Sequence, residues 1–317
     1  MRPPRSERAS EDVHFALSED ELPTGYHLKS GRRGILAVDA DLESAILAAG
    51  FGPDGGESLE ASELSGRRPL RVLRVGGERF VVRVFHHGGM SRGLGPRFYL
   101  DPHRPFRELF LARRLTELGI RTPHVAAARA RRQAPFGWRL DLVTRLIEGT
   151  IDGAAAVTRL TRGEPDGRVR RLVARRLGEV CGRLHAAGFV HADLHPRNFL
   201  FEAHLADGAA PWVLDLDGSR FVRGLTDAAR RRNLARLWRW LRRREQRGRF
   251  LLRTDAARFL RAYEEARGGQ EGEWKGDWAS IDRRERRGRA LHRTGWVIES
   301  LLGSGHEQRD GRLTPRA

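Results

Sequence analysis

One stretch constrains this chain more than any other: residues 191–198 read His-Ala-Asp-Leu-His-Pro-Arg-Asn. Apolar residues at helical spacing from Val173 to Leu184 predict a helix that leads into this stretch. A short apolar run over residues 211–217 follows it and is typical of a buried strand, with Asp215 near its end. The sequence therefore predicts a polar loop between a helix and a strand, with carboxylate and amide side chains at defined spacings.

These residue types suit phosphoryl transfer. Four of them occupy the fixed positions of the kinase pattern H-R-D-L-x-x-x-N, namely His191, Asp193, Leu194 and Asn198. Moving a γ-phosphoryl group needs a carboxylate beside the acceptor hydroxyl and oxygen ligands for Mg²⁺. Asp193 is the candidate for the first role, and Asn198 and Asp215 are candidates for the second. The alternative is a polar loop that matches by chance, but the strand at the expected distance argues against it.

The composition bounds the partners and the compartment. The net charge of +18 at pH 7 implies attraction to polyanions, whether nucleic acid, an acidic membrane surface or a phosphorylated substrate. Cys181 is the only cysteine, so an intrachain disulfide is excluded, and its apolar neighbours indicate a buried thiol in a reducing compartment. No apolar run is long enough to span a bilayer, and the first residues, Met-Arg-Pro-Pro-Arg-Ser-Glu, lack the apolar core of a signal peptide. A cytoplasmic protein, soluble or peripheral, is expected.

Residues 25–147 are predicted to form a small lobe rich in strands, after a loose arm of residues 1–24. Gly76-Gly77 joins two strand candidates in a tight hairpin. In the second strand Val81 and Arg83 share a face, where the kinase V-A-I-K strand carries the residue that covers adenine and the lysine that reaches phosphate. Arg83 replaces that lysine and could still bind phosphate bidentately, or it could be an exposed strand cation.

Two further features complete the candidate nucleotide site. Glu108 lies near the start of a helix predicted from Asp101 to Leu118. It is either the partner of Arg83, as in kinases, or a first-turn acid favoured by the helix dipole, and the order of strand and helix favours the pair. Gly66 and Arg67 lie where a phosphate-covering turn belongs, although the segment is not a G-x-G-x-x-G.

The glycine-rich linker of residues 52–57 is predicted to be flexible.

Residues 148–305 are predicted to form a helical lobe, followed by a tail of residues 306–317. A helix over residues 226–245 has an apolar side, and its other faces carry Arg230, Arg231, Arg232, Arg236, Arg239, Arg242, Arg243 and Arg244. These faces indicate contact with an acidic membrane surface or a phosphorylated substrate, or a solvated charged surface. The order of elements predicts an α+β, two-lobed protein-kinase-like fold with ATP in the cleft.

At this point the chain resembles the bacterial lipopolysaccharide kinases, which include the 3-deoxy-D-manno-octulosonic acid (Kdo) kinases, the closer likeness, and the core heptose kinases. Four segments carry the resemblance: Gly66-Arg67, residues 81–89, residues 191–217 and Asn233-Leu-Ala-Arg-Leu237. The resemblance implies ATP- and Mg²⁺-dependent phosphorylation of a Kdo or heptose hydroxyl in the lipopolysaccharide inner core. It also implies a Kdo-lipid A acceptor and a place at the cytoplasmic, anionic face of the inner membrane of a Gram-negative bacterium. Neither nucleic acid nor an obligate protein partner is expected.

In this interpretation Asp193 accepts the proton of the sugar hydroxyl and Asn198 and Asp215 hold Mg²⁺. The residues assigned to ATP are Arg83, Glu108, Gly66, Arg67 and Val81. Two alternatives stay open: another kinase of this fold that acts on a small molecule or a protein, and a non-catalytic basic pseudokinase. A screen of acceptor molecules would distinguish another kinase of this fold from a lipopolysaccharide kinase. Steeply salt-dependent binding without ATP turnover would indicate the second.

Overall fold

The computed structural model describes residues 19–65, 69–85, 99–133, 137–162, 167–245 and 252–283. The chain divides into two compact units, one from the ranges 1–113 and 124–146 and the other from the ranges 114–123 and 147–317. The second division falls after Leu146, one residue from the lobe boundary drawn from the sequence. Residues 1–18 of the predicted arm, residues 284–305 of the predicted helical lobe and the predicted tail lie outside the described residues.

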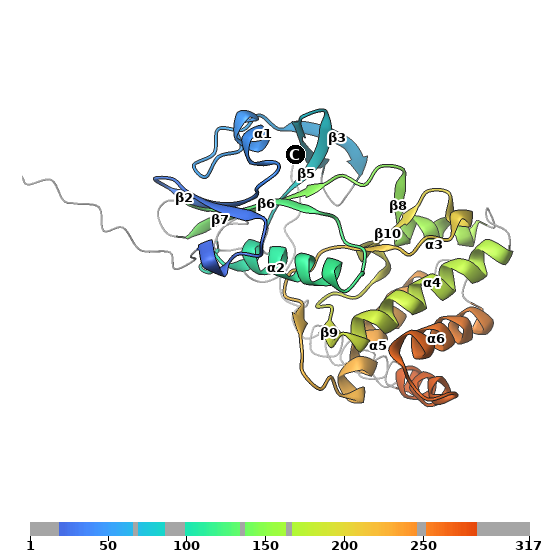
Figure 1. Ribbon diagram of the computed structural model, residues 1–317. Coiled ribbons are helices and arrows are strands. Elements are labelled where there is room, and N and C mark those ends of the chain that lie inside the picture. The colour runs from blue at the N-terminus through green and yellow to red at the C-terminus, as the bar shows by residue number, and fades with distance from the viewer. Residues whose placement is uncertain are drawn as a thin grey trace, which may run out of the picture. The chain divides into compact units, whose positions relative to one another are not determined.

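An antiparallel sheet forms the frame of the first unit, and its described strands follow the order β1-β2-β6-β7-β5-β4-β3 (Figure 1). The strands are β1 (Tyr26–Ser30), β2 (Gly34–Asp39), β3 (Glu60–Ser65), β4 (Pro69–Val75), β5 (Glu78–Val84), β6 (Val125–Arg132) and β7 (Trp138–Arg145). The hairpin predicted at Gly76-Gly77 is present, with positive φ angles of 57° and 86° that favour glycine. The sequence did not predict β1 or β3.

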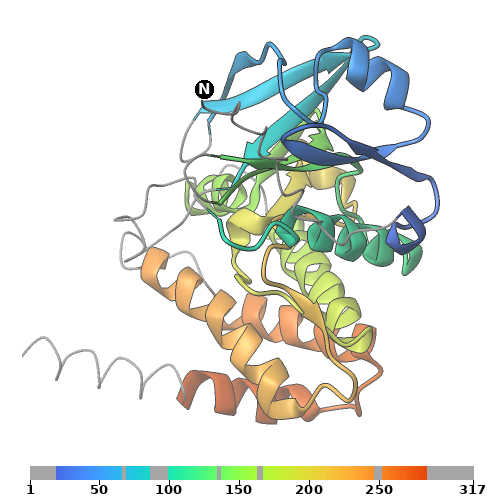
Figure 2. The same ribbon diagram turned by 90° about the vertical axis from the view of Figure 1, so that its left-hand side faces the viewer.

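The second unit is mainly helical (Figure 2). Its helices are α3 (Gly153–Thr161), α4 (Gly167–Ala186), α5 (Asp227–Glu245) and α6 (Arg253–Arg267), and residues 273–283 are also helical. Two small sheets join β8 (Thr150–Asp152), β10 (Phe199–Glu202) and β11 (Trp212–Val213), and β9 (Phe189–Val190) with β12 (Arg220–Phe221). Single 3-10 turns are η1 (Glu19–Glu21) in the first unit, η3 (Pro196–Asn198) and η4 (Leu205–Asp207). Cys181 is buried, as expected, and burial raises the pKa of its thiol.

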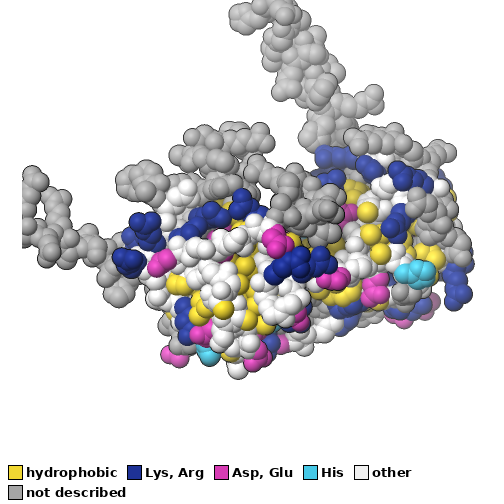
Figure 3. Space-filling view, turned by 90° about the horizontal axis from the view of Figure 1, so that it is seen from above, with side chains coloured by type: hydrophobic (Ala, Val, Ile, Leu, Met, Phe, Trp, Pro, Cys, Tyr) yellow, Lys and Arg dark blue, Asp and Glu magenta, His cyan; other side chains and the backbone are white. Residues whose placement is uncertain are grey.

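Positive charge is distributed over the face that Figure 3 shows. Figure 3 shows lysine and arginine side chains in several groups, with aspartate and glutamate side chains between them. On α5, Arg232, Arg236, Arg239 and Arg243 are exposed, whereas Arg230 is buried. The sequence assigned Arg230 to a charged outer face, and that assignment is wrong because Arg230 bonds to Tyr263 of α6. In the described residues no helix is both long enough and apolar enough to cross a bilayer.

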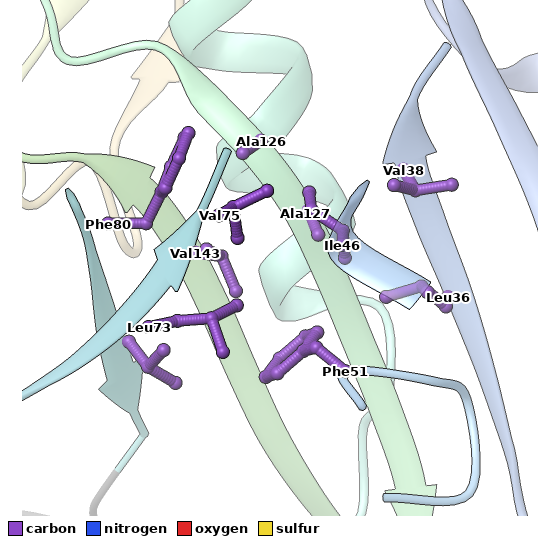
Figure 4. Packing of buried hydrophobic residues seen from close by; sticks show 11 residues of the cluster. Leu36, Val38, Ile46, Phe51, Leu73, Val75, Phe80, Ala126, Ala127 and Val143 are labelled. Atoms are coloured by element: carbon purple, nitrogen blue, oxygen red, sulfur yellow. The ribbon is translucent and has the colours of Figure 1, made fainter. Parts of the chain in front are cut away.

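The core of the first unit lies on one face of the sheet and includes the helix α1 (Glu43–Ala48) (Figure 4). Its buried members are Leu36, Val38, Ile46, Phe51, Leu73, Val75, Phe80, Val82, Ala126, Ala127 and Val143. Because neighbouring side chains of a strand point to opposite faces, Val82 enters this core and Arg83 points to the other face. That face carries α2 (Arg104–Glu117), which holds Phe106 and Leu109 in buried positions (Figure 1).

The segment of residues 52–57 is held in place, so the prediction of a flexible linker is wrong. Arg129 of β6 is fully buried and donates hydrogen bonds to the Gly52 carbonyl at 2.9 Å and to the Glu57 carboxylate at 2.9 and 2.7 Å. Its other partner is the buried Asp141, at 2.7 Å. A buried guanidinium requires such partners. Composition did not reveal them, because Arg129 lies 72 residues after Glu57.

Two glycines one helical turn apart bring α4 close to α6, and Figures 1 and 2 show the two helices side by side. A Cβ on Gly178 would overlap the carbonyl of Phe259, and a Cβ on Gly182 would overlap the carbonyl of Tyr263. Both obstacles are backbone atoms of a helix, which cannot rotate away as a side chain could. The absence of a Cβ at these two positions therefore sets the distance between the helices.

Replacing Gly182 with alanine is expected to destabilise the protein by about 2 kcal/mol, because the added methyl group overpacks the contact with α6. Gly276 provides a matched control, since it lies in a helical segment and a Cβ there meets open space. Alanine at Gly276 is expected to stabilise by up to about 1 kcal/mol through helix propensity. Urea unfolding followed by tryptophan fluorescence measures both. Equal midpoints for the two variants would contradict the packing argument.

Candidate active site

The candidate active-site loop of residues 191–198 lies between β9 and β10 of the second unit. β9 pairs with β12, and β10 pairs with β11. Since β11 precedes Asp215 and β12 follows it, these pairings hold the two motif segments side by side. The start of α3 supports the loop, because Gly153 lies so close to the carbonyl of Pro196 that a Cβ would overlap it.

His191 connects the two motif segments. Its Nε2–H donates to the carbonyl of Leu214 at 2.9 Å, and its Nδ1 accepts the backbone N–H of Asp193 at 3.1 Å. One donor and one acceptor nitrogen define a neutral imidazole, and burial lowers the pKa of His191 in agreement with that form. His191 therefore braces the backbone beside Asp193 and Asp215, and neither of its nitrogens is left to act as a base.

Asn198 and Asp215 present oxygen atoms at this junction. The Nδ2 of Asn198 donates to the carbonyl of Asp193 at 2.8 Å, which directs its Oδ1 away from that bond. In the described part of the chain, that Oδ1 has no hydrogen-bond partner. Leu214 donates its N–H to the Asn198 carbonyl at 2.9 Å, so the next residue, Asp215, is held beside Asn198. Asp215 is exposed, and its φ angle is 54°. Among the described non-glycine residues, Asp215 alone has a positive φ angle.

The carboxylate of Asp193 is 54% exposed and lies between two basic side chains. His195 Nε2 is 3.2 Å from one carboxylate oxygen, and Arg236 Nη1 of α5 is 3.4 Å from the other. Arg236 Nη1 also donates to the carbonyl of Ala192. The sequence did not assign either residue to the site. His195 carried a signal by its place two residues after Asp193, whereas no spacing rule connects Asp193 to Arg236.

A chain of buried hydrogen bonds anchors the loop to α4, α5 and α6. Asn233 donates from Nδ2 to the carbonyl of His191 at 2.7 Å, and its Oδ1 accepts the Nε2–H of His185 at 3.1 Å. The Nδ1 of His185 accepts the hydroxyl proton of Tyr263 at 2.8 Å, and Arg230 donates to the Tyr263 oxygen at 2.8 Å. Each donor in this chain has one matched acceptor, so successive bonds strengthen one another. The resemblance included Asn233, but its contact with the loop was not foreseen.

Burial lowers the pKa of His185 to about 4, against 6.5 for an ordinary histidine. The unfolded chain therefore binds the proton first as the pH falls. The stability that neutral His185 contributes is present above about pH 6.5 and is lost as the pH falls toward about 4. The wild type is expected to lose unfolding free energy when the pH is lowered from about 7 to about 4.5. In His185→Gln this loss is expected to be smaller by about 2 kcal/mol, because the buried imidazole is absent.

Urea unfolding of the wild type and His185→Gln at both pH values measures this difference. Replacing the exposed His204 with glutamine is the control, because it removes an imidazole that is not buried. An identical pH dependence in the wild type and His185→Gln would contradict a buried neutral imidazole at this position.

In the first unit, Arg83 and Glu108 form the expected ion pair, with Arg83 Nη2 donating to the carboxylate of Glu108. The side chain of Glu108 is 5% exposed and that of Arg83 is 31% exposed, so a buried acid holds a half-buried cation. The Arg83 guanidinium also lies 4.5 Å from the centre of the Phe85 ring. Val81 is half-buried two residues earlier on β5. A role for Arg83 in binding phosphate stays a prediction, and Gly66 and Arg67 lie outside the described residues.

The sequence matches the model of the lipopolysaccharide kinase (Kdo/WaaP) family over residues 57–263, well over half of the chain. The chain belongs to this family. Similar proteins include the 3-deoxy-D-manno-octulosonic acid kinase of Stenotrophomonas maltophilia, 32% identical over 59% of this chain and 71% of the relative. Another, from Xanthomonas axonopodis pv. citri, is 33% identical over 63% of this chain and 80% of the relative.

A solved structure is also similar to this member of the family. WaaP, in complex with acyl carrier protein, superposes with a TM-score of 0.51 at 23% identity, over 72% of this chain and 89% of that one. This likeness concerns the fold and confirms the kinase-like α+β class. The predicted family and the enzyme class, a phosphotransferase that uses ATP, are confirmed as well. The match favours a lipopolysaccharide kinase over the two alternatives left open by the sequence.

Proposed function

We propose that this chain transfers the γ-phosphoryl group of ATP to a hydroxyl of Kdo in the inner core of lipopolysaccharide. The family match and the relatives named 3-deoxy-D-manno-octulosonic acid kinase support this acceptor. The observation that carries the chemistry is the exposed carboxylate of Asp193. Its backbone is fixed through hydrogen bonds to His191 and Asn198, so the carboxylate has a defined position from which to meet a hydroxyl.

Asp193 is assigned the acid–base step. The acceptor oxygen forms a bond to the γ-phosphorus, and the bond from that phosphorus to the β–γ bridging oxygen breaks. ADP departs with the electron pair of the broken bond, and the hydroxyl proton passes to the carboxylate of Asp193. His191 cannot take this proton in its observed arrangement because both ring nitrogens are engaged. The assignment of Asp193 therefore follows from access as well as from residue type.

Asn198 and Asp215 are assigned to Mg²⁺. One amide oxygen and one carboxylate are hard donors of the kind this ion prefers, and they leave room for water and phosphate oxygens. The hydrogen bond from Asn198 Nδ2 to Asp193 supports the assignment, because it leaves the amide oxygen as the atom available to a cation. When bound, Mg²⁺ would neutralise negative charge on the phosphates. The residues present thus fit the ion.

Arg83 is assigned to the phosphates of ATP. A guanidinium carries five N–H donors in a planar fork, so it can bind a carboxylate and a phosphate at the same time. The buried Glu108 fixes the orientation of that fork. Gly66, Arg67 and Val81 complete the proposed ATP-binding set on the basis of the sequence alone.

Three exposed arginines of α5 are assigned to the anionic inner-membrane surface. Arg232, Arg239 and Arg243 recur at intervals of seven and four residues, which places them along one face of the helix. Each basic residue near an acidic leaflet contributes about 1 kcal/mol of attraction. This face supports a peripheral position at the cytoplasmic side of the inner membrane, where the acceptor and ATP are both accessible.

An acceptor screen tests the proposal. The protein is incubated with ATP, Mg²⁺ and, in separate reactions, Kdo-lipid A, a heptose-containing core without accessible Kdo, an aminoglycoside and a generic protein substrate. Mass spectrometry is expected to show the gain of one phosphate on Kdo-lipid A. Phosphate on heptose alone would move the acceptor within the core, and phosphate only on the aminoglycoside or the protein would overturn the lipopolysaccharide assignment.

A further inference from the structure

Arg236 of α5 stands beside the carboxylate assigned to proton transfer. Its Nη1 donates to the carbonyl of Ala192 and lies 3.4 Å from Asp193 Oδ1. The bond to a backbone carbonyl fixes the guanidinium relative to the loop. The side chain is nevertheless 50% exposed, so a molecule that reaches Asp193 from solvent also reaches Arg236.

The guanidinium of Arg236 has more donors than these contacts use. Nη1 makes both of them, and within the described part of the chain Nε and Nη2 have no hydrogen-bond partner. The edge formed by Nε and Nη2 presents two parallel N–H bonds, which match the two oxygens of a carboxylate. The site therefore offers a bidentate position for a planar anion next to the place where a hydroxyl would meet Asp193.

The Asp193 carboxylate does not fully satisfy this cation. A single contact of 3.4 Å between two half-exposed groups is a weak ion pair. Three further exposed arginines of the same helix, Arg232, Arg239 and Arg243, add positive potential around it. The surroundings of Asp193 on α5 thus favour an acceptor that carries negative charge over a neutral one.

We propose that Arg236 binds the carboxylate of the acceptor sugar and thereby selects an octulosonic acid over a neutral heptose. This inference rests on the proposed function and names the group of the acceptor that the site recognises. Kdo is a sugar acid, with a carboxylate and hydroxyls on one small ring, whereas heptose has no carboxylate. A bidentate pair with Arg236 orients that ring and presents one hydroxyl to Asp193.

A purely structural role for Arg236 predicts a different result. If the side chain only braced the Ala192 carbonyl, its loss would weaken the loop and lower the rate for every acceptor by the same factor. If Arg236 instead binds the carboxylate, its loss lowers the rate for acceptors that carry a carboxylate and leaves the rate for other acceptors nearly unchanged. The two roles are therefore separated by varying the acceptor and the residue together.

The test uses Kdo-lipid A and its Kdo methyl ester, each in neutral detergent micelles, so that only one charge of the acceptor changes and no anionic membrane is present. The wild type is expected to have a kcat/KM about 50-fold higher for the acid than for the ester, mainly through KM. In Arg236→Gln this ratio is expected to fall to about 3-fold or less, and Arg236→Lys is expected to retain about 10-fold, since lysine keeps the charge but not the fork.

Arg239→Gln is the matched control, because it removes the same charge from the same exposed face of α5. It is expected to keep the full preference for the acid. Loss of the preference in both variants would attribute it to the field of the whole face and overturn the assignment to Arg236. Equal ratios in the wild type and Arg236→Gln would also overturn it.

Equal rates of the wild type with acid and ester would overturn the inference without requiring any variant to fold. If the wild type phosphorylated neither form of Kdo-lipid A, the proposed function itself would fail, and the inference that rests on it would fail as well. Phosphorylation of the acid and the ester at equal rates therefore separates failure of this inference from failure of the function.

Discussion

Replacing Asp193 with asparagine is expected to lower kcat by about 10³-fold, because the amide has nearly the same shape but cannot accept the hydroxyl proton. The fold should survive the change. The contacts that build the loop come from the backbone of residue 193, through its N–H to His191 and its carbonyl to Asn198. The side-chain contacts to His195 and Arg236, at 3.2 and 3.4 Å, involve a half-exposed carboxylate and contribute little to stability.

Steady-state rates, nucleotide binding and urea unfolding of Asp193→Asn and the wild type measure this separation. The KM for ATP and the unfolding midpoint are expected to stay close to their wild-type values. Glu265→Gln is a matched control, since it removes an exposed carboxylate from α6. A kcat for Asp193→Asn within tenfold of the wild type would remove Asp193 from the acid–base step.

Replacing Asp215 with asparagine is expected to raise the Mg²⁺ concentration needed for half-maximal rate and to lower kcat at saturating Mg²⁺ by about 10³-fold. The loss of one anionic ligand weakens the binding of Mg²⁺. A correctly positioned metal ion would stabilise the transferring phosphoryl group by several kcal/mol. Asparagine is the informative replacement because it tolerates a positive φ better than other residues that carry a Cβ. The backbone of residue 215, with φ of 54°, is therefore retained while the charge is removed.

Rates measured over a Mg²⁺ titration, with circular dichroism as a check on folding, test this expectation. Asn198→Ala is expected to shift the Mg²⁺ requirement in the same direction, since it removes the second proposed oxygen donor. Unchanged Mg²⁺ dependence in both variants would exclude this pair as the metal site.

The parts of the site that the sequence predicted are those in which residue type and spacing both carry chemistry. Asp193 and Asn198 lie on one short loop, and Asp215 follows a strand, so local pattern was sufficient to propose them as one site, and the structure brings them together. The pair of Arg83 and Glu108 was expected from the order of a strand and a helix, and the structure contains it. The hairpin at residues 76–77 followed from two glycines between alternating apolar residues.

Contacts between distant elements could not be predicted in this way. Arg236 reaches Asp193 from 43 residues away, and the pairing of Arg129 with Glu57 spans 72 residues. Periodicity shows which face of an element is apolar, but it does not identify the partner of a polar side chain that enters the core. Arg230 illustrates this limit: the sequence places it with the outer arginines, and its burial is explained by the positions of Tyr263 and the buried Asp277.

The most direct test of the central claim follows the phosphoryl group itself. ATP with a heavy-oxygen label in its γ-phosphoryl group is incubated with Mg²⁺, Kdo-lipid A and either the wild type or Asp193→Asn, and the products are fragmented by mass spectrometry. We expect the wild type to place one labelled phosphoryl group on the Kdo fragment, and Asp193→Asn to place almost none in the same time. Labelled phosphate released to water with none on the sugar, or equal labelling of Kdo by the two proteins, would contradict the account.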